Sequence, residues 1–388
     1  MEQGNQRGVK MKKKKSWDKK WYTDEFFAAF KATAKTITED GLTITEKYAP
    51  DAISEIAADP RMLGGPLGKN AKMMSFLPEG VIKKMSMDLS GKGLRNFRKS
   101  CDKVSSAVCV KGGIDLTDQT VTAKDGYEIP IRIYRSEKCE TNGPCLFFMH
   151  GGGFIGGSIP PYDEVWKVFV EKFSVPVVSA AYRLMPEVPY PTPHEDCYCV
   201  LEWIYQNAGT LGIDRTKIFV TGDSAGGNLA QYCSTRAKGT DMVKGQLLLY
   251  ATLNIFRTED KYYKLDGKNF VYEPKQKRLC RRITAQLEIM VNSFHKMNKK
   301  FGVTKPDPYC NPYTFDASGN PPTFISVGAL DFLKNDCIAW AHKLKDAGVP
   351  VKVVVYNGMG HGYINAMGVF PQAEDVIDEM GQFIKENC

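Results

Sequence analysis

One hexapeptide constrains the fold of this 388-residue chain more than any other feature. Residues Gly222–Gly227 have the sequence Gly-Asp-Ser-Ala-Gly-Gly, with Ser224 in the third position. A β-branched and aromatic run at 217–221 precedes them, and residues 228–232 are able to form a helix. A Gly-x-Ser-x-Gly turn between a strand and a helix holds the serine on a strained bend with its Oγ exposed. Because serine is a poor nucleophile on its own, the turn predicts catalysis only if the chain also supplies a base and an oxyanion site.

A glycine run upstream is the candidate oxyanion site. The apolar residues 144–149 predict a strand, and His150–Phe154 (His-Gly-Gly-Gly-Phe) follow it directly. Three consecutive glycines leave backbone N–H groups that no side chain shields. Such groups can point at a developing negative oxygen, as the N-terminus of a helix points at an anion.

Two downstream strands supply the candidate acid and base. Residues 322–328 predict a strand that leads to Asp331, and residues 351–356 predict another that leads to His361 in a glycine-rich loop. The order Ser, Asp, His along the chain is the one expected for an α/β-hydrolase. Each of these residues follows the C-terminal end of a strand, which is where open α/β sheets place their ligands.

Both assignments have competitors in the sequence. His150 belongs to the glycine run of the candidate oxyanion site. Of the other four histidines, His361 is the one in a glycine-rich loop after an apolar strand, so we prefer it as the base. Asp336 is a rival to Asp331, but the apolar residues that follow recur at helical spacing and place Asp336 in the first turn of a helix. We therefore prefer Asp331, the first acid after the strand. The other histidines are His150, His194, His295 and His342.

Four motifs together resemble the hormone-sensitive-lipase family of carboxylesterases. They are His150–Phe154, Tyr182–Glu187 with its continuation to Asp196, Gly222–Asn228, and Asp331 with Gly360–Gly362. The resemblance covers roughly residues 119–388. The family typically has alanine where this chain has Met185, so local packing is expected to differ there.

The resemblance implies a role for each candidate residue. Ser224 is expected to be the nucleophile, His361 the general base and acid, and Asp331 the carboxylate that orients the histidine. The backbone N–H groups of Gly152, Gly153 and Ala225 are expected to form the oxyanion hole. Neither a cofactor nor a metal is expected.

The alternation of predicted strands and helices indicates one α/β domain with a mostly parallel central sheet and helices on both faces. We assign it to residues 119–388. Residues 1–118 are helix-like and carry a basic tail, and residues 255–320 form a long insertion of the kind that often becomes a lid. We interpret these two segments as one mainly helical cap over the serine. The alternative is an unrelated N-terminal domain.

The positive charge of the chain, +8 overall, is concentrated in two segments. Residues 1–20 hold eight Lys and Arg against two acids, and residues 257–300 hold twelve against five. The lysines of the tail precede Trp17, Trp21 and further aromatics. One interpretation is a weak peripheral membrane contact through the basic N-terminus. The other, which we prefer, is a solvated tail leading into a cap helix. No motif favours nucleic-acid binding.

The eleven cysteines are odd in number and scattered, which fits free thiols in a reducing compartment better than disulfides. Asp18, Lys19 and Lys20 interrupt any apolar stretch of a signal peptide. No apolar run reaches the length of a membrane span. We expect a cytoplasmic enzyme.

The sequence thus predicts a serine carboxylesterase that hydrolyses short- to medium-chain acyl esters. A deacetylase or amidase on the same three residues is an open alternative. A non-catalytic member that binds a small ligand, as the similar gibberellin receptors do, is less favoured because those receptors have lost the histidine. A lyase like the similar plant dehydratases is disfavoured by the presence of Ser224. The expected partner is a small-molecule ester, and the sequence does not specify an oligomeric state.

Overall fold

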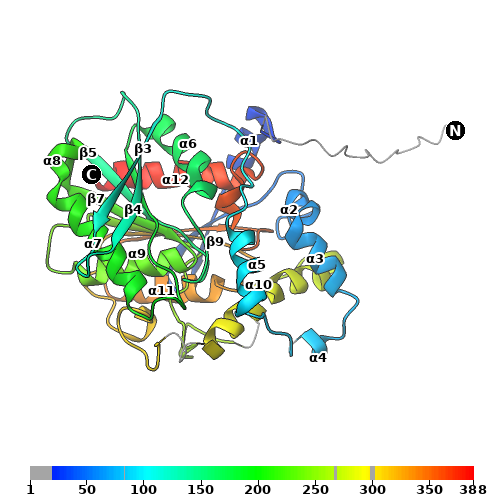
Figure 1. Ribbon diagram of the computed structural model, residues 1–388. Coiled ribbons are helices and arrows are strands. Elements are labelled where there is room, and N and C mark those ends of the chain that lie inside the picture. The colour runs from blue at the N-terminus through cyan, green and yellow to red at the C-terminus, as the bar shows by residue number, and fades with distance from the viewer. Residues whose placement is uncertain (1–19, 83, 266–268, 298–301) are drawn as a thin grey trace.

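A ten-stranded sheet forms the centre of the molecule (Figure 1). The computed structural model describes residues 20–388 except 83, 266–268 and 298–301. Neighbouring strands follow the order β1-β2-β10-β9-β8-β7-β5-β6-β4-β3. Their bounds are β1 Lys35–Glu39, β2 Leu42–Lys47, β3 Asp115–Thr122, β4 Glu128–Arg135, β5 Gly143–Met149, β6 Val177–Ala180, β7 Ile213–Asp223, β8 Gly245–Leu249, β9 Thr323–Gly328 and β10 Val351–Tyr356.

The central strands run parallel, and antiparallel pairs occur only towards the two edges. β8 and β9 are buried along their whole length, as expected for parallel strands covered on both faces. Helices α6 (Asp163–Phe173) and α12 (Pro371–Asn387) lie above the sheet in Figure 1, and α9 (Ala225–Arg236) and α11 (Lys334–Asp346) lie below it. The fold is that of an α/β-hydrolase, as predicted. α7 (Thr192–Gln206) packs on α9, and the short helix α8 (Ala208–Leu211) follows it in the chain.

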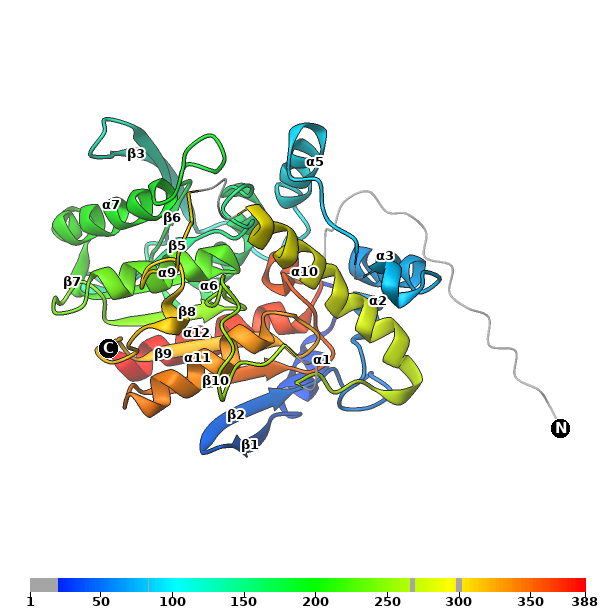
Figure 2. The ribbon, with the colours of Figure 1, turned by 90° about the horizontal axis from the view of Figure 1, so that it is seen from below.

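The expectation that residues 1–118 are helix-like needs one correction. Residues 35–47 form the hairpin β1–β2, and β2 joins the central sheet parallel to β10 (Figure 2). The cause lies in the sequence, where Thr-Ile-Thr-Glu and Leu-Thr-Ile-Thr flank an Asp40-Gly41 turn. β-Branched residues that alternate with polar ones around Asp-Gly favour a hairpin. Both turn residues have positive φ, 44° and 74°.

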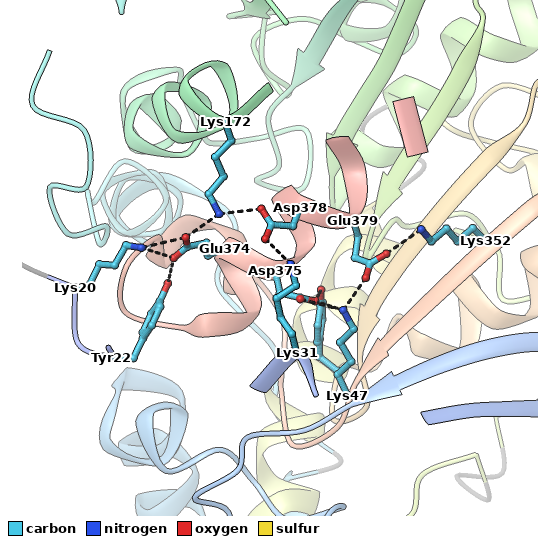
Figure 3. A network of polar contacts seen from close by, with 11 residues as sticks. Lys20, Tyr22, Lys31, Lys47, Lys172, Lys352, Glu374, Asp375, Asp378 and Glu379 are labelled. Atoms are coloured by element: carbon cyan, nitrogen blue, oxygen red, sulfur yellow. Dashed lines mark hydrogen bonds and ion pairs between the residues drawn. The ribbon is translucent and has the colours of Figure 1, made fainter. Parts of the chain in front are cut away.

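A network of ion pairs holds this N-terminal segment to the C-terminal helix α12 (Figure 3). The Nζ atom of Lys47 lies 2.7 Å from Asp375 and 2.6 Å from Glu379, and the Lys47 and Asp375 side chains are almost fully buried. Lys20 and Lys172 both pair with Glu374, at 2.8 Å each. The segment is therefore part of the hydrolase body at this end.

Helices from the N-terminal segment and from the insertion contact each other, as the interpretation of a single cap requires. Helices of the N-terminal segment are α1 (Asp24–Lys31), α2 (Pro60–Gly64), α3 (Pro66–Met74), α4 (Glu79–Ile82) and α5 (Gly91–Cys101). The insertion contributes α10 (Lys277–Met297), which crosses the cap beside α3 (Figure 2). Gln286 on α10 donates to the backbone oxygen of Leu67, 3.0 Å away, and Met87 N–H donates to Ser293, 2.9 Å away.

The fold does not test two of the expectations from the sequence, the domain boundary and the membrane contact. The boundary at residue 119 falls inside β3, and the division into cap and catalytic domain stays a prediction. The membrane contact through the basic tail falls on residues 1–20, of which 1–19 lie outside the described residues. Among the residues that the structure describes, no helix is long and apolar enough to cross a membrane.

Candidate active site

Ser224 lies on the sharp turn between β7 and α9. Its φ of 56° and ψ of −117° are strained values for a residue with a side chain. The turn is also too tight for side chains on its glycines: a Cβ on Gly222 would lie 2.1 Å from the backbone oxygen of Gly226, and one on Gly226 would lie 1.9 Å from that of Met149. The small residues of the hexapeptide therefore allow strand and helix to pass close together, with Ser224 on the turn lining the pocket.

The structure brings His361 and Asp331 together with Ser224. His361 follows β10, and its Nε2 lies 2.9 Å from Ser224 Oγ. Its Nδ1 lies 2.7 Å from Oδ2 of Asp331, which follows β9. The second carboxylate oxygen of Asp331 accepts the backbone N–H of Leu333 at 2.9 Å. Asp331 is fully buried, so a fixed carboxylate holds one side of the imidazole while the other side faces the serine.

The surroundings of His361 favour the protonated imidazole more strongly than water does. Burial lowers the pKa of His361, but the charge of Asp331, the hydrogen bond to it and the charge of Asp223 outweigh burial and raise that pKa above its ordinary value. Such a histidine is a stronger base towards the serine proton. Tyr250 packs edge-on against the imidazole with ring centroids 4.8 Å apart, which restricts its orientation.

Asp336, the rival acid, does not contact the histidine. It lies in the first turn of α11, and its Oδ2 accepts the backbone N–H groups of Leu253 and Asn254 at 2.8 and 2.9 Å. Burial raises its pKa to about 6. Its place in the helix agrees with the sequence interpretation, and its contacts fix the loop after β8.

The glycine loop after β5 lies next to the serine turn. Gly152 and Gly153 have φ of 117° and 62°, and a Cβ on Gly152 would lie 2.1 Å from the backbone oxygen of Gly156. Within the described residues, the N–H groups of Gly152, Gly153 and Ala225 donate to no protein acceptor. The N–H of Ala225 also lies at the N-terminus of α9, where the helix dipole favours negative charge. These three groups are thus available to an anion.

Sequence reasoning missed the part played by Asp223. This buried carboxylate accepts the N–H of Gly151 at 2.7 Å and so ties the glycine loop to the serine turn. Burial raises its pKa to about 6, although hydrogen bonds from Tyr162 and Gly151 oppose that shift. The sequence did carry a signal for this role, because an acid stands directly before the candidate nucleophile.

Residues of the Tyr182–Glu187 motif brace the same loop. Tyr182 donates to the backbone oxygen of His150 at 2.8 Å, and Arg183 pairs with the buried Asp196 at 2.6 Å. Met185, which stands where the family typically has alanine, is buried and lines the pocket over Ser224. The larger side chain therefore faces the space that a substrate would fill.

An apolar pocket opens over Ser224 and has a volume of about 670 Å³ including its mouth. Met290, Val291 and Phe294 of α10 form its cap side. The ring of Phe294 lies so close to the glycine loop that a Cβ on Gly153 would be 2.2 Å from it. The other lining residues are Phe154, Tyr190, His194, Thr252, Ile255, His295, Val303, Cys310 and Leu333.

The cap also contacts the loops that carry the acid and the histidine. Thr284 on α10 donates to the backbone oxygen of Leu330 at 2.9 Å, and Gly360 N–H lies 3.2 Å from the sulfur of Met62 on α2. A movement of the cap would therefore displace residues next to Asp331 and His361.

The described residues contain no group of three or more His, Cys, Asp or Glu side chains able to hold a metal ion. Of the remaining histidines, His150 and His194 are buried, and burial lowers the pKa of each to about 4. Both are therefore neutral at neutral pH.

Comparison with known proteins gives the class of this chain. The alpha/beta hydrolase fold family matches residues 146–365, more than half of the chain, so the chain belongs to this family. The matched range contains Ser224, Asp331 and His361 as well as the glycine loop.

Several proteins similar to this chain are named as ester hydrolases. The ethyl acetate hydrolase of Pseudomonas putida is 27% identical over 67% of this chain and 79% of its own length. Carboxylesterase NlhH of Mycobacterium tuberculosis is 32% identical over the same shares. An esterase from Pyrobaculum calidifontis superposes with a TM-score of 0.64 at 26% identity, covering 83% of this chain and 98% of the other. The prediction of a hormone-sensitive-lipase-like carboxylic ester hydrolase is confirmed at the level of that class.

Proposed function

We propose that this chain is a serine carboxylesterase that hydrolyses short- to medium-chain acyl esters through a covalent acyl-enzyme. The observation that carries the proposal is the continuous chain of hydrogen bonds from Asp331 through His361 to Ser224 beneath an apolar pocket. A nucleophile, a base and an orienting acid in this arrangement suit acyl transfer.

The steps follow from the positions of the groups. His361 Nε2 takes the Ser224 proton as Oγ attacks the ester carbonyl. Asp331 stabilises the imidazolium that forms. The N–H groups of Gly152, Gly153 and Ala225 receive the negative oxygen of the tetrahedral intermediate. The alcohol leaves with the proton from His361, and water then attacks the acyl-enzyme by the same sequence of steps.

The lining of the pocket supports an acyl substrate of limited size. Apolar side chains from α10 line the pocket, and the large side chain of Met185 also lines it. Names of relatives, an ethyl acetate hydrolase, carboxylesterases and an arylesterase, agree with small uncharged esters. A small-molecule ester is therefore the proposed partner.

Hydrolysis of p-nitrophenyl esters of increasing acyl length by the wild type and Ser224→Ala tests the proposal. We expect wild-type activity on the shorter esters and a loss of about 10⁶-fold in kcat for the variant. Ser234→Ala is the matched control, since this buried serine of α9 donates only to the backbone oxygen of Ala230. An inactive wild type, or a Ser224→Ala variant as active as the wild type, would refute the proposal.

Matched p-nitroanilides in the same assay separate an esterase from the deacetylase or amidase alternative. Faster hydrolysis of the anilide than of the ester with the same acyl group would transfer the assignment to the amidase.

We also propose that the enzyme works in the cytoplasm. All eleven cysteines are free in the structure, and seven of them are buried, as in proteins of reducing compartments. Titration of the unfolded protein without reductant should find eleven thiols, and a substantially lower count would contradict this location.

A further inference from the structure

The outer end of the cap exposes apolar side chains in an unusual concentration. Met73, Phe76, Val81 and Met85 have exposed fractions of 68, 85, 47 and 37%. Single exposed apolar residues are ordinary on soluble proteins, whereas several together mark an interaction surface. These four lie within one short stretch of chain. We call this surface the cap tip.

Two of the exposed apolar side chains of the cap tip, Met73 and Val81, lie on the outer faces of helices. On α3, Ala71 and Met74 are buried while Met73 points outward, and on α4 Ile82 is buried while Val81 is exposed. Each helix thus satisfies its packing with one face and still presents an apolar side chain on the other. Figure 1 places α3 and α4 at the end of the molecule away from the sheet.

Basic residues lie beside these apolar side chains. Lys69, Lys72 and Lys84 are exposed on the same stretch of chain. Arg282 of α10 donates to the backbone oxygen of Leu77 at 3.3 Å, so one further basic side chain from α10 contacts this stretch of chain. The surface therefore combines an apolar centre with positive charge.

We propose that the cap tip docks on an anionic lipid bilayer, with Met73 and Phe76 entering the interface and the lysines contacting lipid headgroups. Apolar side chains bordered by basic ones are the composition that binds such surfaces. A second copy of the chain would bring like charges together at the same surface, so charge disfavours a dimer here. Lipid docking goes beyond ester hydrolysis and does not depend on it.

The cap tip is linked to the pocket over Ser224 through helix α10. α3 packs on α10, and α10 supplies Met290, Val291 and Phe294 to the wall over Ser224. Contact with a bilayer would hold this wall near a source of apolar esters.

Flotation of the full chain with vesicles tests the proposal. The vesicles are phosphatidylcholine alone or phosphatidylcholine with phosphatidylserine. We expect the wild type to float with the anionic vesicles and the double variant Met73→Ser, Phe76→Ser to lose about tenfold in affinity. Leu116→Ser is the matched control, because Leu116 is a 40% exposed apolar residue on β3 at the far edge of the sheet.

The basic tail is a second possible source of lipid binding, so a variant with Lys12, Lys13, Lys14 and Lys15 changed to Gln is tested in parallel. Binding that persists in this variant and still requires Phe76 supports the cap tip. A double variant that floats like the wild type, a wild type that does not float, or binding lost only with the tail lysines would overturn the proposal.

Three further measurements on the same proteins test folding and oligomeric state. Hydrolysis of a soluble p-nitrophenyl ester and the thermal midpoint should be unchanged in the double variant, which shows that it is folded. Size exclusion should give the same mass for wild type and double variant. A wild-type dimer that the double variant converts to monomer would assign the surface to a second copy and overturn lipid docking.

Discussion

Nδ1 of His361 lies 2.7 Å from the carboxylate of Asp331, although a second buried acid, Asp336, follows only five residues later in the chain. The two buried carboxylates have separate tasks. Asp331 holds the imidazole, while Asp336 accepts two backbone N–H groups from the loop after β8. Replacing each acid by its amide therefore separates an electrostatic role at His361 from a structural role in a neighbouring loop.

Asp331→Asn should lower kcat for a p-nitrophenyl ester by about 10⁴-fold, because the amide offers no charge to stabilise the imidazolium and favours the wrong tautomer. Asp336→Asn should keep most of the activity, since the amide oxygen can accept the same backbone N–H groups. Steady-state kinetics of the two variants check this. Equal losses, or the larger loss in Asp336→Asn, would contradict the assignment of Asp331.

Activity should fall on the acid side with a midpoint above the ordinary histidine pKa. His361 must be neutral to accept the serine proton, and its pKa is raised by Asp331 and Asp223 against the lowering effect of burial. The rate is therefore retained above this raised pKa and lost as the pH falls through it. A profile of kcat/KM against pH for the wild type measures the midpoint.

Asp223→Asn provides the control for the cause of that midpoint. Its amide oxygen can still accept the N–H of Gly151, but the negative charge that helps to raise the pKa of His361 is gone. The acid midpoint should move to lower pH, with a smaller loss of the plateau rate than in Asp331→Asn. An unchanged midpoint would show that Asp223 does not act on His361 through its charge.

The parts of the site that the sequence predicted are those encoded locally. The tight serine turn requires glycines at fixed positions, and the contacts at Gly222 and Gly226 leave no space for a side chain. Strand-ending residues such as Asp331 and His361 could likewise be placed because parallel strands end at one edge of a sheet.

The contacts that the sequence could not predict join residues that are distant along the chain. Lys47 and Asp375 are 328 residues apart, and no local pattern links them. The contact of Phe294 with the glycine loop depends equally on how the insertion folds over the body. The hairpin at 35–47 is different, because its alternation and Asp-Gly turn were present in the sequence but were outweighed by the helix-like residues around them.

Phe294→Ala should shift the preferred acyl chain towards longer esters. The ring closes the cap side of the pocket against Gly153 and is held edge-to-face by Phe97, with centroids 6.2 Å apart. Its removal opens space beside Ser224, so rates on longer p-nitrophenyl esters should rise relative to the acetate. Phe315→Ala is the matched control, because Phe315 is 38% exposed and does not line the pocket. The same order of preference in Phe294→Ala and wild type would show that this ring does not set the length.

Lys47→Met should destabilise the fold strongly without touching the pocket. The lysine is the cation for Asp375, which also accepts from Tyr356 at 2.7 Å, and for Glu379. Removing one partner leaves a buried charge uncompensated, which costs about 3–5 kcal/mol in the free energy of unfolding. Urea unfolding followed by tryptophan fluorescence measures this change.

Two further variants identify the cause of that loss. Lys35→Met removes a lysine whose pair with Glu55 is exposed, so the stability should stay close to that of the wild type. Adding Asp375→Asn to Lys47→Met should restore part of the lost stability, because the amide is neutral and can still accept from Tyr356. If the single Lys47→Met variant is as stable as the wild type, the ion pair does not hold β2 to α12. If the double variant is less stable than the single one, the loss comes from packing and not from an unpaired charge.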